Sequence, residues 1–133
     1  MRFEFGLEIA RRPEDVFAYL ADPTHLPDWQ ASAVEVRPET DGRWSEVRRF
    51  LGRRLDVEVE AVERDPPRLL TVRSTGGPFP FTVRHRLEPA REGTRLTVVG
   101  KAEAPRFVQL ASRAAERQLR GDFERLKQIL EGG

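Results

Sequence analysis

The chain has 133 residues, of which 38% are hydrophobic and 34% are charged. This length and balance are typical of one folded domain spanning residues 1–133, and they argue against a disordered or membrane-spanning chain. The 23 Lys and Arg residues nearly cancel the 22 Asp and Glu residues, and the two signs alternate along the chain. The charge pattern therefore excludes a clustered basic surface of the kind that binds nucleic acid or anionic membranes.

The sequence also contains few metal-ligating residues and no recognisable targeting or catalytic motif. The sequence contains no cysteine and two histidines, which excludes disulfides and a thiolate nucleophile and leaves few ligands for zinc. No apolar run has the length of a signal peptide or reaches the roughly 18 residues of a membrane span. No P-loop, dinucleotide fingerprint or serine-hydrolase elbow occurs. We expect a cytoplasmic protein without a metal, a cofactor, a bound nucleic acid or a stable membrane insertion.

The first predicted element is a strand over residues 2 to 9, where apolar and charged or small residues alternate with a period of two. Two short helices follow. Pro13 occupies a favourable first helical position with two carboxylates behind it, and Asp22-Pro23 caps a second helical piece over residues 24 to 29. His25, in this irregular segment, is predicted to lie at the surface.

Residues 31 to 103 read as a series of antiparallel strands separated by Gly- and Pro-rich turns. The segments 55–61 and 81–88 alternate most clearly, with one apolar and one charged face, so the sheet is expected to be covered on one side only. The same inward phase reaches Gly100 and Ala102, where the small residues would let another element approach closely or leave space.

After Pro105 the apolar residues recur every three or four positions, which predicts one long amphipathic helix over residues 106 to 130. Its stripe is small at the beginning and bulky toward the end: Val108, Ala111, Ala115, Leu119, Phe123, Leu126 and Leu130. Gly121 interrupts helix propensity midway.

The order of strand, two short helices, about six strands and one long helix resembles the START-like superfamily, which includes the Bet v 1 allergens and the polyketide cyclase and dehydrase proteins. The segments that carry the likeness are Ile9–Phe17, Asp22–Trp29, Arg64–Arg68 and Gly93–Thr97. The resemblance implies an α+β helix-grip fold, a seven-stranded antiparallel sheet wrapped around the C-terminal helix. It also implies a cavity between them that holds an apolar ligand.

His85 is the most prominent candidate site residue, because alternation points it inward between Val83 and Leu87. A buried histidine is either hydrogen-bonded within the core or available as a ligand anchor or general acid/base. Glu46 and Arg48 share parity with two aromatic residues of their strand, Trp44 and Phe50, and would join His85 in the cavity if that face points inward. In the opposite phase Val47 and Leu51 point inward and the charged pair is solvated. The sequence leaves both phases open.

The remaining candidates are apolar or aromatic. Large aromatic side chains in such places serve as core packing, as a lid or, less often, as stacking surfaces for a ligand. The predicted ligand-binding residues are Trp29, Trp44, Arg48, Phe50, Val59, Val72, Phe81, Val83, His85, Leu119 and Phe123.

The sequence is compatible with three functions. The first is the binding or carriage of a small hydrophobic or amphipathic molecule. The second is an enzyme similar to polyketide cyclases and dehydratases, in which His85 moves protons together with Glu46 or Arg48. The third is a protein-interaction module with an unknown partner, although the mixed charge of the outer strand positions speaks against it. A mostly apolar interior favours holding a ligand over transforming one.

Overall fold

A computed structural model describes residues 1–50, 52–103, 106–110 and 112–132. Leu51, Ala111 and the side chain of Val108, which the sequence patterns placed on inward faces, lie outside the described part. The elements follow the predicted order: β1 (Arg2–Ile9), α1 (Pro13–Leu20), the 3₁₀ turn η1 (Pro23–His25), α2 (Leu26–Trp29), β2 (Ala33–Pro38), β3 (Arg43–Phe50), β4 (Arg53–Asp65), β5 (Leu69–Gly76), β6 (Phe81–Ala90), β7 (Gly93–Ala102), α3 (Arg106–Leu110) and α4 (Ser112–Gly132).

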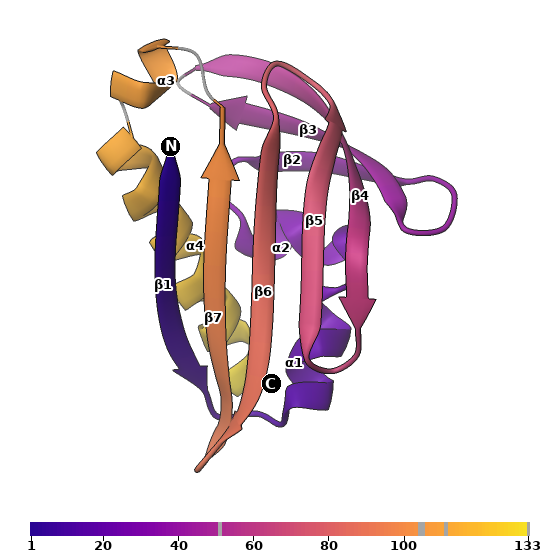
Figure 1. The fold of residues 1–133 in the computed structure, drawn as a ribbon, viewed down its shortest axis with the longest axis vertical. Helices are drawn as coiled ribbons and strands as arrows, with labels where there is room; N and C mark the ends of the chain where they lie inside the picture. Colours follow the sequence, from indigo (N-terminus) through magenta and orange to yellow (C-terminus); the bar gives the residue numbers. More distant parts are fainter. Residues whose placement is uncertain (51, 104–105, 111, 133) are drawn as a thin grey trace.

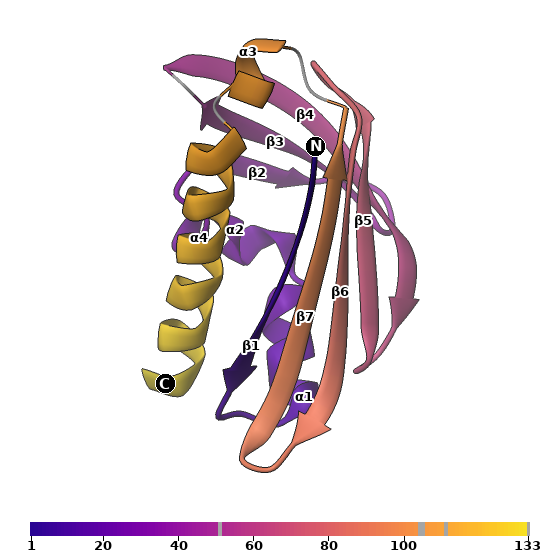
Figure 2. The same cartoon turned by 60° about the vertical axis from the view of Figure 1, so that its left-hand side comes forward.

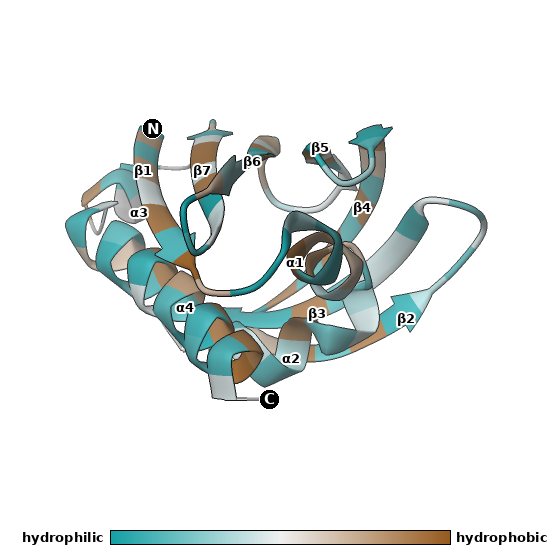
Figure 3. Cartoon of the chain, turned by 90° about the horizontal axis from the view of Figure 1, so that it is seen from below, coloured by the Kyte–Doolittle hydropathy of each residue, from teal (hydrophilic) through white to brown (hydrophobic). Residues whose placement is uncertain are grey.

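The seven strands form one antiparallel sheet in the order β1-β7-β6-β5-β4-β3-β2. Strands β2 to β7 pair with their neighbours in sequence, and β1 joins the sheet beside β7 (Figure 1). The sheet curves strongly, and α1, α2 and α4 lie on its open side (Figures 2 and 3). The predicted helix-grip fold is therefore confirmed.

The expected inward phase of β6 and β7 is present in the register of the sheet. His85 pairs with Val98, and Val83 pairs with Gly100. A Cβ atom added to Gly100 would lie 2.0 Å from Cζ of Phe3, because the Phe3 ring of β1 lies over this glycine. The small residue thus permits the close approach that its position in the strand predicted.

The short helices bury the residues that their patterns indicated. Helix α1 begins with Pro13 and buries Val16, Phe17 and Leu20. The Asp22 side chain accepts a hydrogen bond from the backbone N–H of Thr24 at 3.0 Å and so caps the 3₁₀ turn. The prediction that His25 lies at the surface was only partly right. Its ring stacks on Tyr19 at a centroid distance of 4.0 Å, and its side chain is 32% exposed.

Helix α4 packs its bulky C-terminal half into the main core. Phe123, Leu126 and Leu130 are buried there, together with apolar residues of β1, β6, β7, α1 and α2. Polar contacts fix the same end: Arg11 Nη1 donates to the Leu130 carbonyl at 2.7 Å, and Glu131 accepts from the Ala10 N–H at 2.8 Å. Gly121 does not interrupt the helix. Within the described ranges, no helix is long and apolar enough to cross a membrane.

Candidate ligand-binding cavity

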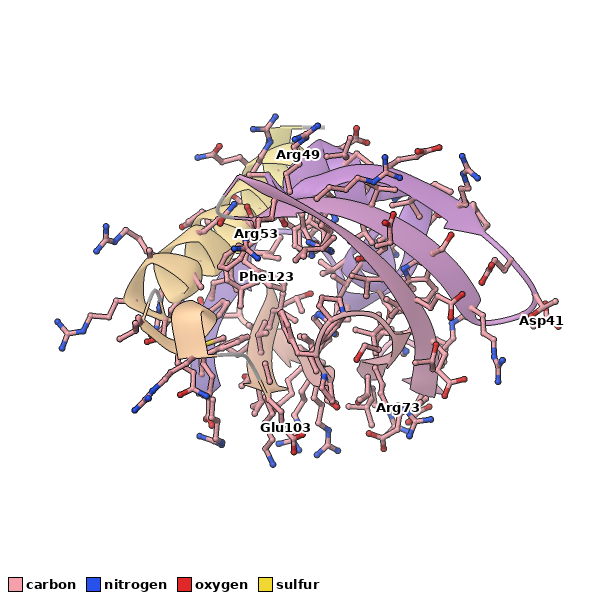
Figure 4. All side chains as sticks on the ribbon, turned by 90° about the horizontal axis from the view of Figure 1, so that it is seen from above. Asp41, Arg49, Arg53, Arg73, Glu103 and Phe123 are labelled. Atoms are coloured by element: carbon pink, nitrogen blue, oxygen red, sulfur yellow. The ribbon has the colours of Figure 1, made fainter. Side chains whose placement is uncertain are left out.

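A cavity of about 460 Å³ lies between the concave face of the sheet and α4. Its lining is mostly apolar and comes from β1, from strands β3 to β7, from α1, η1 and α2, and from the N-terminal half of α4. In the view from above, Figure 4 shows Phe123 inside the curve of the sheet, whereas Asp41 and Arg73 point outward. Ligand pockets commonly measure about 300 to 1,000 Å³, so the cavity is large enough for a small molecule.

All the residues predicted to contact a ligand line this cavity. The structure also chooses between the two phases of β3, because Trp44, Glu46, Arg48 and Phe50 all line the cavity and Val47 does not. The predicted residues brought together are Trp29, Trp44, Arg48, Phe50, Val59, Val72, Phe81, Val83, His85, Leu119 and Phe123.

Glu46 and Arg48 form the centre of a polar network on the β3 side of the cavity. The Glu46 carboxylate, which is 4% exposed, accepts hydrogen bonds from Trp44 Nε1 and Arg48 Nε, each at 2.6 Å. The Arg48 guanidinium also donates to Ser32 Oγ at 2.7 Å and to Gln30 Oε1. The buried negative charge of Glu46 is thus neutralised by Arg48, which makes its burial tolerable.

Asp122 of α4 extends the polar side of the cavity. It is 7% exposed and accepts a hydrogen bond from the Ala31 N–H at 3.1 Å. Burial raises the pKa of this carboxyl group, while the hydrogen bond from Ala31 and the charges of Arg48 and Arg125 act in the opposite direction.

The sequence interpretation did not include Gln30, Ser32 or Asp122. For Asp122 a signal existed, because it stands three residues after Leu119 and four before Leu126, on the apolar stripe of the helix. An acidic residue in that position needs a buried partner. No comparable signal marks Gln30 and Ser32, whose role depends on the place of Arg48 in the folded sheet.

His85 lies in a separate, apolar part of the cavity wall. Its side chain is 5% exposed, its Nδ1 lies 2.9 Å from the Leu70 carbonyl oxygen, and its ring contacts Phe123 at a centroid distance of 5.8 Å. Burial lowers the pKa of His85 to about 4, and the hydrogen bond to Leu70 only partly opposes this shift. The imidazole is therefore neutral at physiological pH.

The structure does not join His85 and Glu46 into a hydrogen-bonded dyad. Strands β6 and β3 are separated in the sheet by β5 and β4. His85 hydrogen-bonds to the Leu70 carbonyl, and Glu46 accepts hydrogen bonds from Trp44 and Arg48. The two candidate catalytic groups line one cavity but have separate partners.

The two tryptophans have different surroundings. Trp44 is hydrogen-bonded to Glu46, as described above, whereas Trp29 is 1% exposed and packs edge-on against Phe123 at 4.9 Å. Among the described residues, Trp29 Nε1 is the buried side-chain polar atom without a hydrogen-bond partner. Nor do three or more His, Asp or Glu side chains come together as a possible metal site anywhere in the described ranges.

Solved structures share this architecture. A Deinococcus radiodurans protein, DR_A0006, aligns with a TM-score of 0.78 at 22% identity, covering 98% of each chain. A START superfamily protein from Mycobacterium smegmatis aligns with a TM-score of 0.82 at 14% identity, covering 98% of this chain and 97% of its own. The di-domain ARO/CYC StfQ from the steffimycin biosynthetic pathway aligns with a TM-score of 0.78 at 16% identity, covering 98% of this chain and 51% of its own.

These likenesses define the fold class as START-like. Residues 2–131 match the sequence family described as polyketide cyclase / dehydrase and lipid transport, and the chain belongs to this family. No curated protein sequence matches the chain.

Proposed function

We propose that the protein binds a small hydrophobic or amphipathic molecule in its internal cavity and thereby stores or carries it. The observation that supports this most directly is the cavity of about 460 Å³ with its mostly apolar lining. Moving apolar surface out of water is favourable by about 25 cal/mol per Å², so an apolar molecule that covers this wall gains affinity from burial alone. The family to which the chain belongs adds support, because its description includes lipid transport.

The polar network restricts the kind of polar group that such a ligand presents. The hydrogen bonds to Glu46, Ser32 and Gln30 use three of the five N–H groups of the Arg48 guanidinium, which leaves donors for a ligand oxygen. The positive charge of Arg48 is matched by Glu46 at 2.6 Å. We therefore expect a neutral acceptor, such as a carbonyl or hydroxyl oxygen, in preference to a free carboxylate or phosphate.

A matched pair of substitutions in α4 tests the proposal. Ala115 lines the cavity, whereas its neighbour Ala114 is exposed. Ala115→Phe places a ring in the ligand space, and Ala114→Phe adds the same ring outside it. The neutral dye N-phenyl-1-naphthylamine, which fluoresces in apolar surroundings, serves as the probe.

The wild-type protein and Ala114→Phe should bind the dye saturably with one site. Ala115→Phe should bind it at least about tenfold more weakly, since about 1.4 kcal/mol of lost contact corresponds to that factor. The absence of saturable binding to the wild type, or equal binding by both variants, would contradict the proposal.

A cyclase- or dehydratase-like reaction is the second candidate, and the observation that favours it is the neutral imidazole of His85 in the cavity wall. Such a group accepts a proton next to an enolisable carbonyl. A general base works best when its pKa lies near the operating pH, and a pKa of about 4 makes His85 a weak base. Binding therefore has the stronger support. If His85→Ala retains full activity on an identified substrate, the catalytic role is wrong.

A further inference from the structure

One nitrogen of the cavity wall has a defined hydrogen-bonding character and no partner. His85 Nδ1 lies 2.9 Å from the Leu70 carbonyl oxygen. A carbonyl oxygen only accepts hydrogen bonds, so Nδ1 carries the proton and donates it. In a neutral imidazole the other nitrogen, Nε2, then has a lone pair and acts only as an acceptor. The tautomer of His85 follows from this single backbone contact.

A second observation shows that Nε2 is accessible from the cavity. No hydrogen bond to Nε2 comes from any described residue. Among those residues, the fully buried side-chain polar atoms without a partner do not include Nε2; Trp29 Nε1 is the one such atom. Nε2 therefore keeps some accessible surface. Because His85 is only 5% exposed and lines the cavity, that surface opens into the cavity.

The neighbours of His85 in the sheet and on α4 are apolar. Its partner across the sheet on β7 is Val98, its partner on β5 is Leu70, and Phe123 of α4 contacts its ring. The hydrogen bonds of the Arg48 guanidinium go to Glu46, Ser32 and Gln30 and not to His85. A ligand that donates a hydrogen bond to Nε2 would therefore give this acceptor the partner that it lacks within the protein.

From this geometry we infer that His85 Nε2 accepts a hydrogen bond from a hydroxyl group of the ligand, and that the ligand class is a hydroxylated apolar molecule such as an alcohol, a phenol or an enol. This inference rests on the proposed ligand-binding function and narrows it. A carboxylate is disfavoured at this point, because its oxygen lone pairs would face the lone pair of Nε2.

Two probes of nearly equal size isolate the hydroxyl group. 2-Naphthol has an O–H donor, and 2-methoxynaphthalene has the same ring system without one. Isothermal titration calorimetry on the wild-type protein should give three- to tenfold tighter binding of 2-naphthol, the factor expected from one net hydrogen bond of about 1 kcal/mol.

Three variants then assign the difference to Nε2. In His85→Asn the amide can still donate to Leu70 but does not reach the position of Nε2, so the preference for 2-naphthol should fall to about one. In His85→Gln the longer amide can place its oxygen near that position and should restore part of the preference. His85→Phe keeps an aromatic ring in the wall but has no nitrogen, so it replaces His85→Asn if that variant does not fold.

The outcomes separate this inference from the proposed function. If the wild type binds neither probe, the cavity is not a binding site for molecules of this kind and both proposals fail. If both probes bind with equal affinity, or if the preference persists in the folded Asn or Phe variant, ligand binding stands and the role of His85 is wrong.

Discussion

At the scale of single residues, Gly100 shows how closely two strands of the sheet depend on each other. A methyl group at this position would lie 2.0 Å from the Phe3 ring. We therefore predict that Gly100→Ala lowers the free energy of unfolding by roughly 1–3 kcal/mol, the usual range for overpacking a filled site. Urea denaturation measures the change.

Gly121 of α4 provides the matched control. Nothing lies within 4 Å of a Cβ atom added there, and the position is exposed on the helix. Gly121→Ala should therefore stabilise the protein, by up to about 1 kcal/mol, because alanine has the higher helix propensity. The expectation about Phe3 is refuted if both glycine substitutions change stability in the same direction.

His85 links stability to pH. Its pKa is lowered from 6.5 to about 4 in the folded protein, so between these values the unfolded chain binds a proton that the folded chain does not. Stability is therefore highest above the unfolded value and is lost as the pH falls. Between pH 7 and pH 5 the contribution of His85 should fall by about 2 kcal/mol.

The measurement is urea denaturation of the wild type and His85→Asn at both pH values. The variant should lose about 2 kcal/mol less stability between them. Asp122, whose pKa is raised, acts in the opposite sense and is present in both proteins, so the difference between them isolates His85. Equal losses in the two proteins would mean that His85 is not buried in its neutral form.

At the scale of elements, α4 divides into a cavity half and a core half. Leu119 is partly exposed and lines the cavity, whereas Leu126 is fully buried in the main core. Leu126→Ala should lower the free energy of unfolding by about 2–5 kcal/mol. Leu119→Ala should lower it less, since its side chain already borders empty space. Equal losses would show that the two halves pack alike.

The elements themselves could be predicted because their signals are local. Alternation marks β1, β4 and β6, and a spacing of three or four marks α4. The inward face of β3 could not be predicted in this way, because both of its faces carry apolar and charged residues. Pairing decides it: Trp44 lies opposite Val59, and Arg48 lies opposite Leu55 on β4. Such a register depends on contacts across the sheet, which a single segment does not encode.

At the scale of the whole molecule, the cavity residues could be predicted but their partners could not. A period of two placed His85, Val83 and Phe81 on one face. The network around Arg48 brings together β3, the segment after α2 and, through Asp122, the last helix. These groups are far apart in sequence, and the volume between them depends on the curvature of the whole sheet.

A filled cavity should also make the whole molecule more stable. A ligand that binds only the folded state at 100 times its Kd adds about 2.7 kcal/mol. For a chain of 133 residues this corresponds to a rise in Tm of roughly 10 °C. Thermal denaturation with increasing N-phenyl-1-naphthylamine, followed by circular dichroism, measures the shift.

The two alanine variants of α4 show whether the cavity causes this stabilisation. Ala114→Phe should keep the full rise in Tm, because Ala114 is exposed. Ala115→Phe should lose most of it, because its ring occupies part of the cavity that Ala115 lines. A dye bound to the outer surface would raise the Tm of both variants alike, and that result would remove the cavity as the source of ligand-linked stability.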